Sequence, residues 1–270
     1  MTEDNFAFPE WLDDFQITDE VFAVAYEAVL PPQRAWMKKT IAQVYAVNSP
    51  DSPQSKWTVN TWKGGFETEI ANSPLDCVLM LVDKGATSAV RILAALAPAL
   101  AVGVQNILVV FVGEGELSQP VLTGFELAGQ EAVVSLSDDK FSELISFVYE
   151  SEVSTAILDL RSCPTDLSYS ENVRYWRAPN ISVISICADE DGPDMDVVKF
   201  AHPDVTIEET TIEDLAESGG DVAIVPAELI GEALVDFKMV LSHEQEGCWM
   251  WNNLTDRFFR KDSVALAVCL

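Results

Sequence analysis

The stretch DCVLMLVDKGATSAVRILAALAPALAVGVQNILVVFV, residues 76–112, contains the pattern that determines the fold. Residues 76–82 form an almost continuous apolar run of strand length, which is typical of a strand covered on both faces. Residues 88–102 are apolar nearly all round a helix, so we expect this helix to be buried and to end at Gly103. Residues 107–112 predict a second buried strand.

The same alternation of strand and helix continues to residue 160. Strand patterns at 132–136 and 155–160 follow helical patterns at 120–128 and 141–150. Strands that alternate with helices form parallel sheets, and their crossovers are right-handed. The sequence therefore predicts a Rossmann-like parallel α/β unit within residues 75–160.

Other patterns flank this unit. An apolar arm at residues 6–15 is expected to dock either on its own domain or on a partner subunit. Further patterns predict helices at 18–29, 34–47, 211–217 and 227–241, a hairpin at 58–62 and 66–70 around Gly64-Gly65, a loop at 161–180, and strands at 181–187, 205–209, 222–225, 247–251 and 264–268.

We expect an α/β protein with three parts. Residues 1–71 supply the N-terminal arm, a helix pair and the hairpin, and residues 72–165 form the Rossmann-like domain. Residues 166–270 form a second α/β lobe that packs with the N-terminal region. In this arrangement the N-terminal helices and the C-terminal strands build the second lobe together.

Composition restricts the classes of partner. Of the 270 residues 49% are hydrophobic, so the chain can bury a sizeable core. The net charge of −28 repels phosphate backbones; nucleic acid binding is not expected, and an anionic ligand would need a locally compensated site. No unbroken apolar run reaches about 18 residues, and the acidic N-terminus is unlike a signal peptide. We therefore expect a cytoplasmic protein without a membrane span.

The cysteines and histidines offer little catalytic chemistry. Five cysteines without a C-x-x-C pair favour buried free thiols over disulfides. Cys187 is a candidate nucleophile, but the acidic residues that follow it would raise the pKa of its thiol; they are Asp189, Glu190, Asp191, Asp194 and Asp196. His243, Glu246 and Cys248 are candidate metal ligands, although a position at a helix end explains His243 without a metal.

Two glycine-containing turns follow the first two predicted strands. Gly85-Ala86-Thr87-Ser88 leads into the apolar helix, and Gly113-Glu114-Gly115 follows the second strand. Ligands of doubly wound sheets bind at the carboxyl ends of the strands, and N–H groups at a helix start hold phosphate. The candidate cofactor-binding residues are therefore Gly85, Ala86, Thr87, Ser88 and Gly113, with a plain turn and cap as the alternative. Glu114 argues against phosphate at the second turn.

The segment Cys248-Trp249-Met250-Trp251-Asn252-Asn253 is unusually aromatic. One interpretation is a strand that packs on both faces. The other is a ligand-binding or intersubunit surface, because tryptophan is enriched at such contacts.

Several of these segments together resemble one protein family. Residues 86–110 are similar to the core of the histidinol dehydrogenases, with a Ser/Thr-containing turn, a helix with an internal Pro-Ala, a glycine stop and a strand. Residues 17–45 and 121–129 resemble that family's paired N-terminal helices and its next helix. Residues 247–258, GCWMWNNLTDRF, are similar to the Asn-x-Ser/Thr-x-Arg-Phe segment of the wider aldehyde dehydrogenase-like superfamily. The likeness covers residues 17–160 and 222–268.

The departures from this family concern its chemistry. Its members use NAD, a zinc ion bound partly through a Gln-x-x-His motif, and a catalytic Glu-His pair. This sequence has no Gln-x-x-His, and His243-Glu244 stands in the reverse order. The resemblance implies NAD or NADP at the turn of residues 85–88, while the departures imply no zinc and leave the catalytic residues unknown.

Two hypotheses about function follow. The first is a shortened, diverged histidinol dehydrogenase-like oxidoreductase relative of NAD type, without the zinc-dependent activity. The alternative is a non-enzymatic binding or assembly protein on an aldehyde dehydrogenase-like fold. Its interaction surfaces would be residues 6–15 and the segment around Trp249 and Trp251. In either case we expect a homo-oligomer, most simply a dimer, and a small-molecule ligand.

Overall fold

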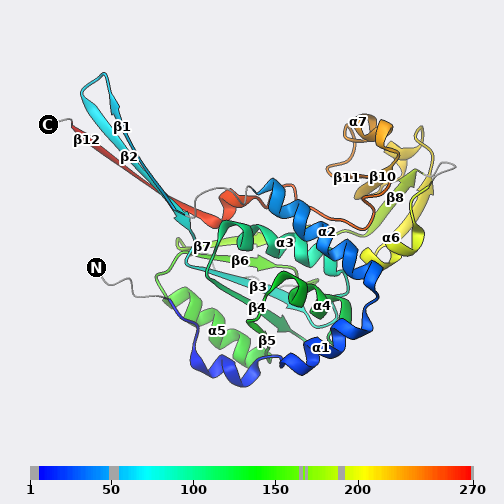
Figure 1. Cartoon of the computed structure of the whole chain (residues 1–270), viewed down its shortest axis with the longest axis horizontal. Coiled ribbons are helices and arrows are strands. Elements are labelled where there is room, and N and C mark those ends of the chain that lie inside the picture. The colour runs from blue at the N-terminus through cyan, green and yellow to red at the C-terminus, as the bar shows by residue number, and fades with distance from the viewer. Residues whose placement is uncertain (1–5, 49–54, 164–166, 168–169, 188–191, 269–270) are drawn as a thin grey trace.

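The computed structural model describes residues 6–48, 55–163, 167, 170–187 and 192–268. Within these ranges the strands form a five-stranded, a four-stranded and a three-stranded sheet. The five-stranded sheet lies at the centre of the molecule, the four-stranded sheet forms a lobe to one side, and the three-stranded sheet projects as an arm (Figure 1). No helix among the described residues is long and apolar enough to cross a membrane.

The five-stranded sheet is entirely parallel, with strand order β5-β4-β3-β6-β7. Its central strand is fully buried up to its last residue, as the continuous apolar run predicts. The strands are β3 (Cys77–Asp83), β4 (Asn106–Val112), β5 (Val133–Ser135), β6 (Thr155–Asp159) and β7 (Val173–Arg177).

Strand β7 lies within residues 161–180, where we expected a loop, and that expectation is wrong. The strand VRYWR places Val173 and Trp176 inside and leaves Tyr175 exposed. Because β7 is an edge strand of the sheet, it can carry the charged residues Arg174 and Arg177. Its pattern therefore differs from that of the buried strands by which the sheet was predicted.

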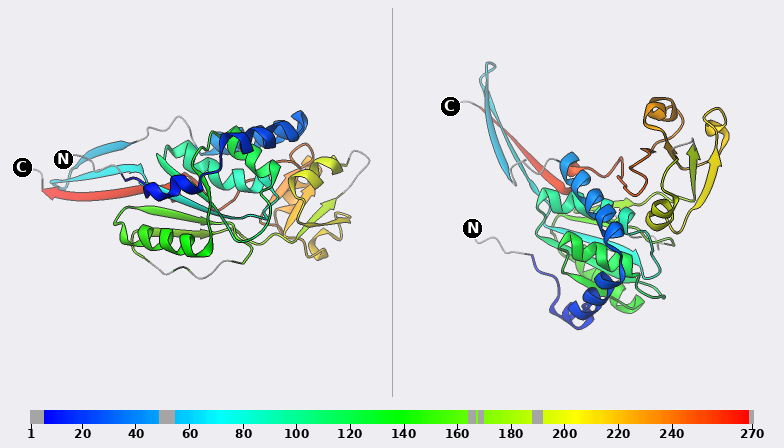
Figure 2. Two further views of the ribbon diagram at one scale, coloured as in Figure 1. Left: turned by 90° about the horizontal axis from the view of Figure 1, so that it is seen from below. Right: turned by 45° about the vertical axis from the view of Figure 1, so that its right-hand side comes forward.

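Helices cover both faces of this sheet. On one face lie α3 (Ala89–Val102) and α4 (Gln119–Ala128), and on the other lies α5 (Asp138–Glu150). The N-terminal helices α1 (Asp19–Ala28) and α2 (Pro31–Val47) pack on α4 and α3 as a further layer (Figure 2). Helix α3 is therefore enclosed by the sheet and by other helices, which explains why it is apolar all round.

The N-terminal arm docks on its own chain. The ring of Phe6 lies 6.1 Å from the ring of Phe147 in α5, and Leu12 is buried in the core on that face. The short helix η1 (Glu10–Phe15) contacts β5. Of the two expected docking sites for this arm, the structure selects its own domain.

The four-stranded sheet is also parallel, with order β11-β10-β8-β9. Its core is continuous with that of the first sheet, because one hydrophobic cluster includes residues of both. Its elements are β8 (Val183–Cys187), α6 (Met195–Ala201), β9 (Thr206–Thr210), η2 (Leu215–Glu217), β10 (Val222–Val225), η3 (Ala227–Leu229), α7 (Ile230–Ala233) and β11 (Val240–Ser242).

Two predictions for this region are wrong. Residues 227–241 form two short helices and strand β11 instead of one helix. Ala233 and Phe237 are buried at a spacing of four residues, which imitates helical periodicity, while Val235 between them is 81% exposed. Residues 247–251 form no strand; they run irregularly through the interior, with Trp249 and Trp251 buried.

The arm is an antiparallel sheet of order β1-β2-β12, formed by β1 (Lys56–Trp62), β2 (Phe66–Pro74) and β12 (Arg260–Val268). The short helix η4 (Asp256–Phe259) connects it to the body. The predicted hairpin is thus confirmed. The last strand, expected in the second lobe, pairs with this hairpin instead. The N-terminal helices cover α3 and α4 of the first sheet, and α2 also contacts the residues after β11, through Lys39 to the Glu244 carbonyl and Gln43 to Gln245. The division of the chain at residues 71 and 165 stays a prediction.

A buried carboxylate ties β6 to β7. Asp159 is fully buried and accepts two hydrogen bonds from the Arg161 guanidinium, at 2.9 and 2.7 Å, and one from the Tyr175 hydroxyl at 2.8 Å. Burial and the bond to Asp159 raise the pKa of Tyr175 to about 12. Removing one member of a buried ion pair lowers the stability of the fold, because the remaining charge stays desolvated without a partner.

We expect Asp159→Ala to lower the free energy of unfolding by about 3–5 kcal/mol, because Arg161 would keep its charge without a counterion. Tyr175→Phe should cost about 1 kcal/mol, the value of one hydrogen bond. Urea unfolding at pH 7 measures both. Glu143→Ala, which breaks an exposed ion pair with Lys140, is the control and should cost less than about 0.5 kcal/mol. Equal losses for Asp159→Ala and Glu143→Ala would contradict the structural role of Asp159.

Candidate functional site

A cleft of about 720 Å³ opens at the carboxyl ends of β3, β4, β6 and β7. Strands β4 and β5 lie on one side of β3, and β6 and β7 lie on the other. The chain therefore changes direction between β3 and β6, and the loops that leave these two strands separate there. Ligands of open parallel sheets bind at such a switch point, so the topology itself places a site here.

All five predicted cofactor-binding residues line this cleft: Gly85, Ala86, Thr87, Ser88 and Gly113. Gly113 has a φ of 82°, a conformation that favours glycine. Gly85 lies against the second turn, since a Cβ at Gly115 would come within 3.2 Å of the Gly85 nitrogen. The Ser88 hydroxyl donates to the Ala201 carbonyl at 2.7 Å, so this side chain holds the end of α6.

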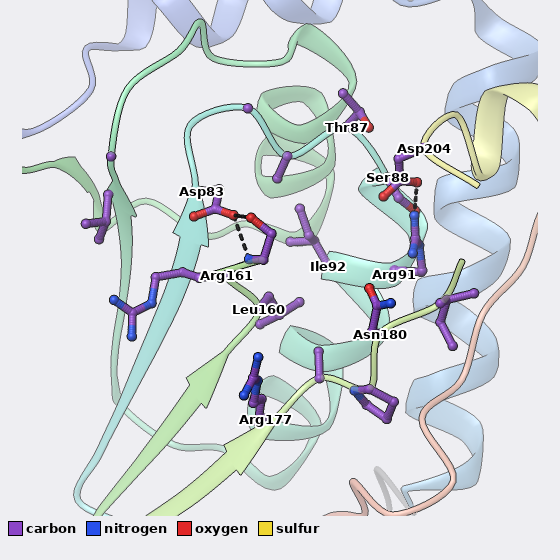
Figure 3. A pocket seen from close by; sticks show the side chains of 18 of the residues that line it. Asp83, Thr87, Ser88, Arg91, Ile92, Leu160, Arg161, Arg177, Asn180 and Asp204 are labelled. Carbon is purple, nitrogen blue, oxygen red and sulfur yellow. Dashed lines mark hydrogen bonds and ion pairs between the residues drawn. The ribbon is translucent and has the colours of Figure 1, made fainter. Parts of the chain in front are cut away.

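The opposite wall comes from segments outside the two predicted turns. The end of β7 and the segment after it contribute residues 177–182, and the loop after α6 contributes Asp204 (Figure 3). Trp251 comes from the irregular stretch near the C-terminus. These segments are far apart in the sequence and lack a motif. For Trp251 the signal was the aromatic segment 248–253, for which a ligand-binding surface was one of the two interpretations; its presence in the lining agrees with that interpretation.

Three arginines line the cleft in different states. Arg91 pairs with Asp204, and burial lowers the pKa of its guanidinium to about 10. Arg161 is held by Asp159. Arg177, the last residue of β7, is exposed and has no hydrogen-bond or ion-pair partner in the described part of the chain. Arg177 is therefore the cation available to a ligand.

The acidic residues of the lining are also partly engaged. The Asp83 carboxylate accepts from the Ser162 backbone nitrogen at 2.7 Å and from its hydroxyl at 2.6 Å, which joins the ends of β3 and β6. Glu114 is exposed at the rim. With Asp204, the lining contains three acids and three arginines. The cleft is formally neutral within a chain of net charge −28, which is the local compensation that an anionic ligand needs.

The described lining contains neither cysteine nor histidine. Cys187 is buried at the end of β8 in the other sheet. Of the acids expected to raise its pKa, those at 189–191 lie outside the described residues, while Asp194 caps α6 and Asp196 lies in its first turn. His243, Glu246 and Cys248 do not form a metal site, because no group of three His, Cys, Asp or Glu side chains among the described residues could hold an ion.

His202 lies buried behind Arg91. Its Nε2 is 3.0 Å from the Glu246 carbonyl oxygen, and its ring centroid is 5.1 Å from that of Trp249. Burial, with a contribution from the Arg91 charge, lowers the pKa of His202 to about 3. The imidazole is therefore neutral in the folded protein. His202 is therefore part of the packing behind the cleft wall.

Comparisons with known proteins identify the fold. No protein-family model matches the sequence, and no curated protein matches it. The structure is similar to histidinol dehydrogenase from Elizabethkingia anophelis, with a TM-score of 0.58 and 11% identity over 96% of this chain and 78% of that chain. It is less similar to PnpE from Pseudomonas sp. WBC-3, with a TM-score of 0.47 and 10% identity over 93% of this chain and 89% of that one. An NAD-dependent benzaldehyde dehydrogenase from Corynebacterium glutamicum matches with a TM-score of 0.46 and 11% identity, over 92% of this chain and 84% of that one.

At these sequence identities a structural match is evidence for the fold alone. The evidence here is the match to histidinol dehydrogenase. The chain has an α/β fold like that of histidinol dehydrogenase, which confirms the predicted fold class.

The pH dependence of stability tests the environment of His202. An unfolded histidine has a pKa near 6.5, so below about pH 6.5 the unfolded chain binds a proton that folded His202 refuses down to about pH 3. Stability is therefore lost as the pH falls from 6.5. We expect wild type to lose about 1 kcal/mol more than His202→Phe between pH 7.5 and 5.5, measured by urea unfolding. The same loss in both proteins would show that His202 titrates normally.

Proposed function

We propose that this chain is a diverged, histidinol dehydrogenase-like relative of the NAD-type oxidoreductases that binds NAD or NADP in the cleft. The observation that supports this best is the position of the cleft at the switch point of the parallel sheet, with residues 85–88 and Gly113 in its wall. Its volume of about 720 Å³ lies within the ordinary range for small-molecule sites.

The residues of the cleft suit the parts of a dinucleotide. No side chain caps the N-terminus of α3, so its first N–H groups remain available to a phosphate beside the turn of residues 85–88. Ile92, Leu160 and Ile181 supply apolar surface for a planar ring. Arg177 supplies a positive charge from the opposite wall. When bound, the dinucleotide would supply hydride chemistry, and this chain would bind and orient it.

The zinc ion of the histidinol dehydrogenase family does not fit the described residues, which contain no suitable cluster of ligands. We therefore derive no zinc-dependent step. Asp83 and Glu114 are the carboxylates nearest to the expected turns, and Asp83 is engaged by Ser162. The catalytic residues stay unassigned.

One observation favours the alternative, a non-enzymatic binding protein. The described lining contains no histidine or cysteine that could act as base or nucleophile. The two interaction surfaces suggested by sequence do not support assembly, however. Residues 6–15 pack on α5 and β5, and Trp249 and Trp251 are buried within the chain. The alternative is therefore a ligand-binding role.

Calorimetric titration with NAD and NADP tests the binding proposal. We expect saturable binding, weakened about tenfold by Arg177→Ala because an unpaired cation in the cleft is lost. Lys199→Ala removes the same charge from an exposed position on α6 and should leave the affinity unchanged. An absence of binding at millimolar concentrations of both dinucleotides would refute the proposal. Binding without reduction of the dinucleotide by any aldehyde or amino alcohol would favour the alternative.

A further inference from the structure

A small polar cluster lies behind the wall of the cleft, where the two parallel sheets meet. Arg91 belongs to α3 on the first sheet, His202 follows α6 of the second lobe, and Trp249 lies in the irregular segment near the C-terminus. The ring centroid of Trp249 is 5.1 Å from that of His202, and the guanidinium carbon of Arg91 is 5.9 Å from the same Trp249 centroid. The three side chains therefore form one contiguous group.

Each member of this cluster has a buried polar atom without a hydrogen-bond partner in the described part of the chain. These atoms are Arg91 Nε, His202 Nδ1 and Trp249 Nε1. The three residues are between 1% and 9% exposed, so bulk solvent does not reach them. Nearly all buried polar groups of native proteins are paired with the protein or with ordered water, because an unpaired group keeps its desolvation penalty. Three such atoms in one cluster therefore point to a common partner.

Hydrogen-bond chemistry defines what this partner must be. Arg91 Nε and Trp249 Nε1 each carry one hydrogen and can only donate. His202 Nε2 is 3.0 Å from the Glu246 carbonyl oxygen, which can only accept. Because burial keeps the imidazole neutral, its one ring hydrogen is on Nε2, and Nδ1 is an acceptor. The partner must therefore accept two hydrogen bonds and donate one.

A water molecule meets this requirement, whereas ions do not. Water has two lone pairs and two hydrogens, and buried waters typically make about three hydrogen bonds. A chloride ion could accept from Arg91 and Trp249 but would face the lone pair of His202 Nδ1. A metal cation would face the Arg91 charge, and no group of three His, Cys, Asp or Glu side chains among the described residues could hold one.

We propose that Arg91, His202 and Trp249 form a binding site for one internal water molecule, which joins the two lobes behind the cleft wall. The water accepts from Arg91 Nε and Trp249 Nε1 and donates to His202 Nδ1. On the cleft side, Arg91 pairs with Asp204, two residues after His202 (Figure 3). The water is thus a second link between α3 and the loop after α6, and it holds Arg91 from the interior.

A high-resolution crystal structure of the wild-type protein, from crystals soaked in sodium bromide, tests the identity of the bound species. We expect a density peak within about 3.2 Å of Arg91 Nε, His202 Nδ1 and Trp249 Nε1, without an anomalous bromide signal. An anomalous peak at this position would show an anion and overturn the proposal. Well-ordered side chains without any density between them would overturn it as well.

Magnetic relaxation dispersion of water oxygen-17 counts the long-lived internal waters in solution. His202→Phe removes the acceptor and fills the space with a second apolar ring, so it should lower the count by one water relative to wild type. The matched control is Thr123→Val on α4, which removes another buried polar atom without a partner among the described residues. A single hydroxyl cannot supply the about two to four partners that a buried water needs, so this variant should keep the wild-type count.

Equal counts for wild type and His202→Phe would refute the site in solution, as would equal losses in the two variants. Circular dichroism establishes that both variants are folded. Should His202→Phe fail to fold, the wild-type crystal structure still decides, because it requires no substitution.

Discussion

The burial of α3 on all sides is the constraint on which the rest of the structure depends. The helix lies on β3 and β4, with α2 and α4 packed against it and η4 beside it. Since it has no polar face, every neighbour must be apolar on the side that meets it, and so the N-terminal helices are drawn onto the first sheet. The same burial fixes the start of the helix beside the turn of residues 85–88, at the edge of the cleft.

Electrostatics determine what the cleft can accept. A strongly acidic chain excludes anions from most of its surface, yet three of its sixteen basic residues line this one cleft. Two of them are neutralised by neighbours that also hold the walls in place, Asp159 and Asp204. Arg177 is therefore the arginine that can interact with a ligand, while the two paired arginines hold the walls of the cleft in place.

Much of the first sheet could be predicted, because buried parallel strands and their crossover helices carry strong, regular patterns. The turn of residues 85–88 could be predicted for the same reason, since a turn after a buried strand faces the ligand edge. Strand β7 could not, because an edge strand lacks a continuous apolar run. The places of Arg177 and Asp204 in the cleft could not be predicted either, because both residues reach it through long-range packing. The hairpin β1-β2 was predicted, but its pairing with β12 was not, because β12 follows β2 by almost two hundred residues.

The cleft has walls from both parallel sheets, so a ligand bound there would contact both lobes. Residues 83–92 belong to the first sheet and its helix, while Asp204 belongs to the second lobe and reaches across to Arg91. Ser88 is held in the same way by the carbonyl of Ala201. A ligand bound between these walls would add contacts that join the two lobes. Its binding energy would then appear partly as increased stability of the contact between the two lobes.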